Sequence, residues 1–102
     1  MPPTPPLVEL FGKPDCHLCE DAKRLLRALQ TTYAFTLREI NIAEHAALSI
    51  QYGEEIPVVF INGRKAFKYR IDVKQFRRWL QRARRNEPST WRVWLWKKRH
   101  QS

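Results

Sequence analysis

The chain contains two cysteines, Cys16 and Cys19, which stand three positions apart. Two thiols at this spacing can be joined and separated again by thiol–disulfide exchange, so the pair could act as a redox centre. The same spacing also suits two ligands of a metal site, or two small residues of a hydrophobic core. The rest of the sequence has to distinguish these three interpretations.

The position of the pair favours redox chemistry. Cys16 falls where an extended stretch gives way to a helical pattern, and Lys13 adds a nearby cation. A thiol at a helix N-terminus loses its proton more readily, because unpaired N–H groups and partial positive charge gather there. We therefore predict that Cys16 is the exposed nucleophile and that Cys19, one turn later and more inward, resolves the mixed disulfide. His17 and Leu18 lie between them and are expected to border the substrate; His17 either favours the thiolate when protonated or is simply exposed.

Metal binding and an inert role remain as alternatives. A tetrahedral zinc site needs four ligands. The chain offers Cys16, Cys19 and His17, while His45 and His100 stand at unsuitable spacing. A metal held within one chain is therefore not predicted. An iron–sulfur cluster shared between two chains, with Cys16 as a ligand, stays open, as does a pair of buried structural cysteines.

Apolar patterns predict the elements that position the pair. Apolar runs of strand length occur at Leu7–Phe11, Phe35–Ile42 and Val58–Ile61. Arg64–Ile71, with two apolar residues amid charge, is expected to be an antiparallel return strand. Helical spacing of apolar residues runs from Cys16 to Tyr33, over Ala43–Tyr52 and after Asp72. Strands that alternate with helices imply parallel pairing, whereas Asn62-Gly63 is a strong hairpin signal that adds an antiparallel strand. The prediction is an α/β fold of order β-α-β-α-β-β-α, with a four-stranded mixed sheet flanked by helices on both faces.

Acidic residues are placed to begin two of these helices. We expect Asp15 to cap the first helix and Asp72 to cap the last, because a carboxylate accepts hydrogen bonds from the free N–H groups there. The last helix should bury one apolar stripe and expose a basic face. The expected stripe consists of Val73, Phe76, Trp79, Leu80 and Ala83.

Length and composition fit one domain with a modest core, since 43% of the 102 residues are hydrophobic. No run of about 18 apolar residues is present, and the start lacks the charged-then-apolar pattern of a signal peptide. A cytoplasmic location is therefore expected, where thiols are kept reduced and a C-x-x-C pair indicates catalysis or metal binding. We divide the chain into a Pro-rich tail (1–6), a domain (7–86) and a linker with a basic Trp-rich tail (87–102).

Positive charge is concentrated in the second part of the chain. Residues 1–63 hold five Lys or Arg and eight Asp or Glu, whereas residues 64–102 hold 14 and two. This asymmetry indicates either an anionic partner or a solvated basic helix and tail. The tail residues Trp91, Trp94 and Trp96 precede three cations and would suit an anionic membrane surface or single-stranded nucleic acid. Packing of the tail on its own domain, or on a second copy, is equally open.

Two motifs in the expected order carry a family resemblance. The first is KPDCHLC (Lys13–Cys19), after the first strand, and the second is EIPVVFING (Glu55–Gly63). From about Leu7 to Arg85 the chain resembles the glutaredoxin-like proteins of the thioredoxin superfamily, in particular short members with a Cys-His-Leu-Cys site. Glutaredoxins carry a lysine three residues before the first cysteine and a cis proline that opens the third strand, which Pro57 matches here.

The resemblance implies a thioredoxin-like fold and thiol–disulfide exchange with a protein disulfide or a low-molecular-weight thiol. It implies no bound cofactor, and glutathione is the usual reductant. A cis Ile56–Pro57 bond would turn the Ile56 backbone outward, toward a substrate lying across Cys16. The Gly-Gly-x-Asp segment that holds glutathione in glutaredoxins is replaced by Phe67–Arg70 (FKYR), so thioredoxin reductase is the other candidate source of electrons. Lys68 and Arg70 are expected instead to attract an anionic end of the substrate.

Overall fold

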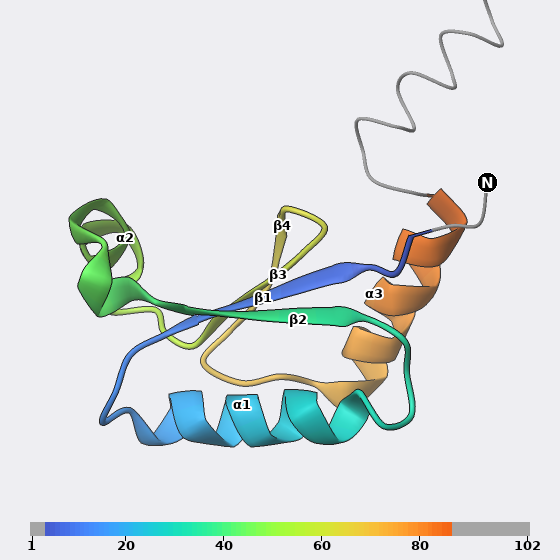
Figure 1. Ribbon diagram of the computed structural model, residues 1–102, viewed down its shortest axis with the longest axis horizontal. Coiled ribbons are helices and arrows are strands. Elements are labelled where there is room, and N and C mark those ends of the chain that lie inside the picture. The colour runs from blue at the N-terminus through green and yellow to red at the C-terminus, as the bar shows by residue number, and fades with distance from the viewer. Residues whose placement is uncertain (1–3, 87–102) are drawn as a thin grey trace, which may run out of the picture.

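The structure is a computed structural model that describes residues 4–86, so the predictions for the Trp-rich tail and for His100 lie outside the described residues. Figure 1 shows the order of the elements along the chain. The strands are β1 (Leu7–Gly12), β2 (Thr36–Asn41), β3 (Val58–Ile61) and β4 (Arg64–Lys68). The helices are α1 (His17–Leu29), a single 3-10 turn η1 (Ile42–Glu44), α2 (Ala46–Tyr52) and α3 (Val73–Asn86).

The four strands form one mixed sheet in the order β2-β1-β3-β4. Strand β1 pairs in parallel with β2 and antiparallel with β3, and β3 pairs antiparallel with β4. Both central residues of the β3–β4 turn have positive φ, 50° at Asn62 and 81° at Gly63. This is the twist that a two-residue hairpin needs, and Asn-Gly provides it at low cost. The predicted element order, the mixed sheet and the hairpin are therefore confirmed.

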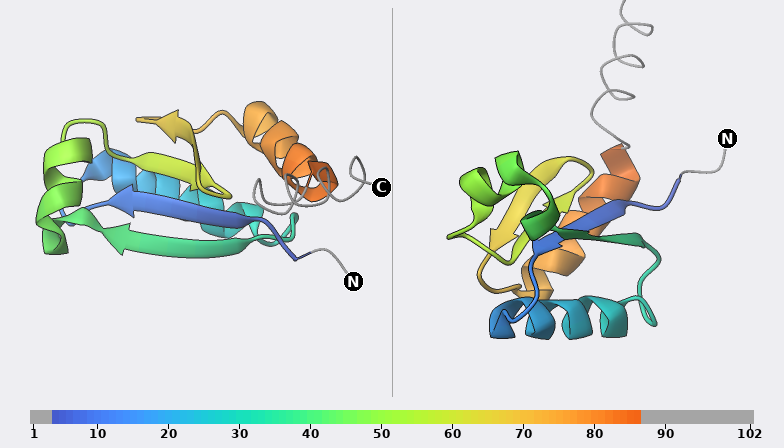
Figure 2. Two further views of the ribbon diagram at one scale, coloured as in Figure 1. Left: turned by 90° about the horizontal axis from the view of Figure 1, so that it is seen from above. Right: turned by 60° about the vertical axis from the view of Figure 1, so that its left-hand side comes forward.

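Successive side chains along β1 and β3 point to opposite faces of the sheet, so the apolar residues of these strands are shared between the two faces. Val8 and Leu10 pair with Ile61 and Val59 and face α1 and α3. Phe11 pairs with Val58 and faces the opposite side, toward α2. Figures 1 and 2 show α2 at one end of the sheet, away from α1 and α3. Helices therefore flank both faces, as predicted.

The side chains form two groups, which we name the core cluster and the site cluster. The core cluster lies between the sheet, α1 and α3 and consists of Val8, Leu10, Ala22, Leu26, Phe35, Val59, Ile61, Phe76 and Leu80. The site cluster lies at the end of the sheet near α2. Its buried members are Cys19, Ile42, Ile56 and Val58, with Phe11, Cys16, Leu48, Tyr52 and Phe60 packed against them.

The N-terminus of α1 differs from the prediction. Cys16, not Asp15, is the N-cap: the Cys16 side chain accepts a hydrogen bond from the Cys19 N–H. Asp15 adopts a left-handed backbone with φ of 63°, so this residue makes the turn that leads into the helix. Asp tolerates this conformation better than most residues because its short polar side chain can bond locally. The predicted Asp15 cap was therefore wrong by one residue.

The last helix agrees with the prediction at its start but not along its whole stripe. Asp72 caps α3, since its Oδ1 accepts the Gln75 N–H at 3.1 Å. Phe76 and Leu80 are buried at 0% and 2% exposure, whereas Val73 is 43% exposed. Val73 is the first residue of α3 and does not belong to the core cluster, which α3 first reaches at Phe76, one turn later.

Further elements were predicted longer than they are: α1 ends at Leu29 rather than Tyr33. The second helical region is split into η1 and α2 by His45, which has extended backbone angles. Strand β4 ends at Lys68 rather than Ile71, because Tyr69 adopts a left-handed conformation with φ of 68°. Among residues 4–86, no helix combines the length and the apolar character needed to span a membrane.

Candidate functional site

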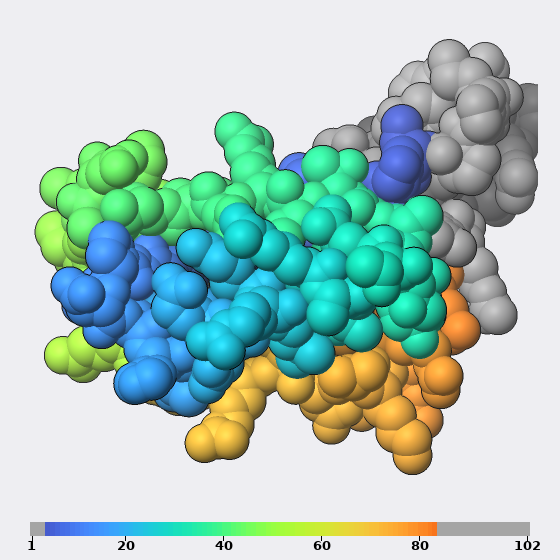
Figure 3. Space-filling model, turned by 60° about the horizontal axis from the view of Figure 1, so that its bottom comes forward, coloured from blue at the N-terminus to red at the C-terminus, as the bar shows by residue number. Residues whose placement is uncertain are grey.

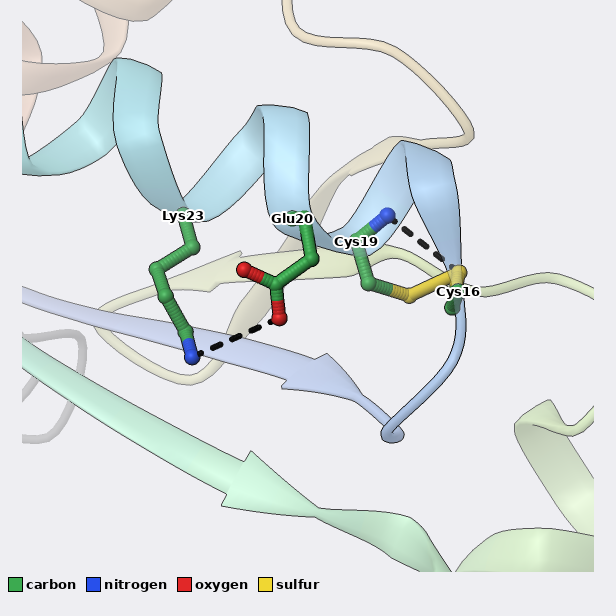
Figure 4. Close-up of a disulfide and its surroundings, with 4 residues drawn as sticks. All are labelled: Cys16, Cys19, Glu20 and Lys23. Carbon is green, nitrogen blue, oxygen red and sulfur yellow. Dashed lines mark hydrogen bonds and ion pairs between the residues drawn. A yellow bond between two sulfur atoms is a disulfide. The ribbon is translucent and has the colours of Figure 1, made fainter.

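The two cysteines form a disulfide at the N-terminal end of α1 (Figure 4). Their Cα atoms are 5.1 Å apart, and Cys16 Sγ also accepts the Cys19 N–H at 3.2 Å. Cys19 is only 5% exposed, while Cys16 is half-buried. The outer sulfur is therefore Cys16, and the same helix-start N–H that bonds it in the disulfide is placed to stabilise a thiolate in the dithiol form.

Gly12 allows β1 to approach this disulfide closely. A Cβ atom added at Gly12 would lie 3.1 Å from both Cβ and Sγ of Cys19, tighter than an ordinary contact. The last residue of β1 therefore has to be small for Cys19 to occupy its buried position. The sequence reasoning did not single out Gly12, although a glycine between a strand and a C-x-x-C motif indicates a close backbone approach.

The segment before β3 forms a second wall of the site. The Ile56–Pro57 peptide bond is cis, the form that the family resemblance implies. Ile56 and Cys19 are buried in the site cluster, with Cys16 packed against it, so residues 40 positions apart in sequence lie together. Within residues 4–86, no hydrogen bond involves the Ile56 backbone N–H or C=O. These two groups are available to pair with a bound chain.

The residues between the cysteines are accessible. His17 is exposed at the first position of α1, and Leu18 is 37% exposed in the same turn. Leu18 is thus a large apolar side chain exposed beside the disulfide. Figure 3 shows the face of the molecule that α1 crosses, with residues of the first turns of α3 along its lower edge.

The predicted cations lie at different distances from the cis-proline segment. Lys68 is exposed at the end of β4, with Nζ 4.0 Å from Oε1 of Glu55, directly before Ile56. Arg70 is exposed two residues further on, and its N–H donates to the Lys68 carbonyl. The structure thus brings Lys68 to the wall of the site, and it leaves the Arg70 side chain at the surface.

A cavity of about 330 Å³ lies behind the buried cysteine, between α1 and the ends of β1 and β2. Lys13, predicted to influence Cys16, is exposed and lines this cavity. Charged groups surround it: Lys23 lies 3.7 Å from Glu20 and 3.9 Å from Glu39, and the first of these pairs is drawn in Figure 4. The sequence reasoning missed this cavity, because it is made by side chains from three elements.

Glu55, in the wall of the site, has a lowered pKa. Its carboxylate accepts a hydrogen bond from Lys65 Nζ at 2.5 Å. This bond, together with the positive charges of Lys65 and Lys68, lowers the pKa of Glu55 below its ordinary value of 4.5. The wall beside Ile56 therefore carries a fixed negative charge that two lysines surround.

Metal ligands do not gather around the cysteines in the described part of the chain. Within residues 4–86 no three His, Cys, Asp or Glu side chains come together in an arrangement that could hold a metal ion. The described residues therefore offer only the two cysteines to a cluster shared between two chains.

Comparisons with known proteins agree with this geometry. A family model described as a glutaredoxin-like domain (DUF836) matches residues 7–81. The solved structure of protein Ne2328 from Nitrosomonas europaea is 30% identical, covers 76% of this chain and 93% of its own, and superposes with a TM-score of 0.67. Protein XcR50 from X. campestris is 32% identical, with 72% and 95% covered and a TM-score of 0.58. Thioredoxin 1 from Thermosipho africanus, at 14% identity with 74% and 94% covered and a TM-score of 0.54, shares the fold.

Proposed function

This chain belongs to the glutaredoxin-like domain family, and from that premise we propose that it is a thiol–disulfide oxidoreductase with Cys16 as nucleophile and Cys19 as resolving thiol. The observation that carries the proposal is the Cys16–Cys19 disulfide at the start of α1, with its outer sulfur half-buried and its inner sulfur buried. A redox pair needs this asymmetry, because a substrate must reach one sulfur while the second waits behind it.

The proposed cycle begins with the dithiol. The Cys16 thiolate attacks one sulfur of a substrate disulfide, forms a mixed disulfide and expels the first substrate thiolate, which takes up a proton. Cys19 then loses its proton and attacks Cys16 Sγ, which releases the second substrate thiol and leaves the Cys16–Cys19 disulfide. Two thiol equivalents from a reductant restore the dithiol, so two electrons pass from the reductant to the substrate.

We place the substrate between the Cys16 side of α1 and the cis-proline segment. Leu18 offers an apolar contact, and the unpaired Ile56 backbone offers one donor and one acceptor to an extended chain. Lys68 is an exposed cation at the cis-proline wall of this position, and Lys13 and Arg70 are exposed cations of the segments before α1 and after β4, so we propose a substrate with an anionic end. His17 is exposed in the first turn of α1 and lies within the same proposed contact area.

The reductant is tested by supplying electrons from two sources. Reduction of hydroxyethyl disulfide is measured with glutathione and glutathione reductase, and separately with thioredoxin reductase. Turnover with either source supports the proposal and identifies the reductant. Absence of turnover with both would contradict it. We expect the reaction to belong to the upkeep of thiol balance in the cytoplasm, where such reductants keep thiols reduced.

A second candidate function rests on the exposed cations of α3. Lys74, Arg77, Arg78 and Arg82 are exposed, and no ion pair involves them within residues 4–86. A helix face of this kind attracts an anionic surface or nucleic acid. Binding to anionic vesicles and to an oligonucleotide, measured with the full chain and with a chain lacking residues 89–102, tests this candidate. Binding that both forms share would show that residues 89–102 are not needed for it and would support the α3 face, and no binding would remove this candidate.

A further inference from the structure

Tyr69 holds an unusual backbone conformation next to the cis-proline segment. Its φ is 68°, in the left-handed region that bulky residues rarely adopt because the Cβ atom comes too close to the following carbonyl oxygen. Glycine would adopt it at little cost, yet the Phe67–Arg70 stretch contains no glycine. A side chain that is retained at such a position is expected to make interactions that glycine could not.

The interactions of Tyr69 are directed at one segment. Its backbone N–H donates to the Pro57 carbonyl at 2.8 Å, and its phenolic OH donates to the Glu54 carbonyl at 3.1 Å. Tyr69 is 43% exposed, so burial of apolar surface does not account for its position. Tyr69 thus bonds residues 54 and 57 at the same time, from 15 and 12 positions further along the chain.

Two lysines of β4 interact with Glu55, which lies between the two residues that Tyr69 bonds. Lys65 Nζ donates to Glu55 Oε1 at 2.5 Å and lies 5.7 Å from the centre of the Tyr52 ring. Lys68 Nζ is 4.0 Å from the same carboxylate oxygen and 5.6 Å from the centre of the Tyr69 ring. Residues 54, 55 and 57 are therefore all tied to β4 or to the residue that follows it, while Ile56 has no hydrogen bond within residues 4–86.

We propose that Tyr69 is a positioning residue that clamps residues 54–57, so that the free N–H and C=O of Ile56 are held ready for the disulfide substrate. The proposal rests on the oxidoreductase function and adds a residue outside both cysteine motifs. A segment that is already fixed loses little conformational entropy when a substrate chain pairs with it, so the clamp strengthens substrate binding. The sulfur chemistry at Cys16 does not involve Tyr69, so the clamp contributes to KM rather than to kcat.

The variant Tyr69→Phe tests the clamp, because it removes the phenolic OH and retains the ring. Tyr33→Phe is the matched control, since within residues 4–86 no hydrogen bond involves the Tyr33 OH. We expect Tyr69→Phe to raise KM for a peptide disulfide by about 3–10-fold, the effect of one lost hydrogen bond, and to leave kcat within about twofold. Tyr69→Gly, which removes the strain and the ring together, is expected to raise KM at least as much.

Amide hydrogen exchange gives a readout that does not depend on turnover. The Glu55 N–H is bonded to the Tyr52 carbonyl and the Tyr69 N–H to the Pro57 carbonyl, so both should exchange about 3–10-fold faster in Tyr69→Phe and at the wild-type rate in Tyr33→Phe. Faster exchange together with a raised KM supports the proposal. Unchanged exchange, or faster exchange with an unchanged KM, overturns it. Absence of turnover in the wild-type protein would contradict both the oxidoreductase function and the clamp. Turnover in the wild type together with an unchanged KM in Tyr69→Phe would contradict the clamp alone.

Discussion

The core cluster lies between the sheet, α1 and α3, whereas the site cluster lies at the end of the sheet near α2, and the two differ in what their side chains can do. The core cluster is aliphatic and aromatic throughout, and Phe76 and Leu26 within it are fully buried. The site cluster is smaller and includes Cys19 and the half-buried Cys16 at its edge. Neighbouring residues of a strand point to opposite faces, so β1 and β3 contribute to both clusters at once.

This division separates stability from chemistry. Aromatic rings brace the site cluster: Phe11 lies 5.0 Å from Phe60 and 5.4 Å from Tyr52 between ring centres. These rings pack against the cluster in which Ile56 and Cys19 are buried. We therefore expect changes in the core cluster to alter the free energy of unfolding, and changes in the site cluster to alter activity. The following predictions test that separation, beginning with the largest effect.

Replacement of the nucleophile should give the largest effect. Cys16→Ser is expected to abolish turnover, because a hydroxyl does not ionise at neutral pH and cannot form the mixed disulfide. Cys19→Ser is the contrasting variant: it retains Cys16, so it should still form a mixed disulfide that an external thiol must resolve. Mass spectrometry after incubation with a disulfide substrate detects that adduct. An adduct on Cys16→Ser at the remaining cysteine, with retained turnover, would assign the nucleophile to Cys19.

Replacement in the core cluster should lower stability and spare the chemistry. Phe76 is fully buried and its ring centre lies 5.3 Å from that of Phe35, so Phe76→Ala is expected to lower the free energy of unfolding by about 3–5 kcal/mol. Val73→Ala, on the same helix but 43% exposed, should change it by less than about 0.5 kcal/mol. Urea unfolding measures both, and kcat is measured at a temperature where the variant is folded. A large loss of kcat in folded Phe76→Ala would show that the two clusters are coupled.

Local signals in the sequence were sufficient for most of the fold. Apolar spacing, the Asn62-Gly63 turn and the Asp72 cap act over a few residues, and each was predicted from its immediate neighbours. The Asp15 prediction failed because a left-handed turn and a thiol cap compete with an ordinary carboxylate cap at the same place. Two motifs were enough to predict that Cys16 and Ile56 share a site, but only through family resemblance.

The remaining features depend on contacts that no local pattern encodes. The hydrogen bond from Tyr69 to Glu54 joins residues 15 positions apart. The positive φ of Tyr69 is also not predictable from its residue type, because bulky residues rarely adopt it. The cavity behind Cys19 arises where α1 crosses two strands, so its charged lining depends on the packing of three elements. Sequence reasoning therefore locates the two cysteines and misses Tyr69 and the charged lining of the cavity, which depend on contacts between elements.

Gly12 lies at the boundary between the two clusters and should affect both properties. In Gly12→Ala the new Cβ would meet Cys19 Cβ and Sγ at 3.1 Å, so the strand or the disulfide must shift. We expect the oxidised protein to lose about 1–3 kcal/mol of unfolding free energy, the usual cost of an added methyl in a packed site. The reduced protein should lose less, because the Cys19 thiol is then free to rotate. Urea unfolding of both forms measures the difference, and equal losses in the two forms would show that the decisive contact is with the Cys19 Cβ rather than with its sulfur.

The smallest predicted effect concerns the ion pair at the rim of the site cluster. The hydrogen bond from Lys65 lowers the pKa of Glu55 in the folded protein, so the pair stabilises the fold above the ordinary pKa of 4.5 and loses that contribution as the pH falls through the lowered value. Glu55→Gln should therefore show a flatter decline of stability at acid pH than the wild type, by a small amount because the pair is exposed to solvent. Glu44→Gln is the control, since Glu44 is exposed and has no ion pair within residues 4–86. Thermal unfolding at a series of pH values measures the slopes. Identical slopes in wild type and Glu55→Gln would mean that the interaction of Glu55 with the two lysines does not contribute to the free energy of unfolding. The clamp on residues 54–57 would then depend on Tyr69 alone.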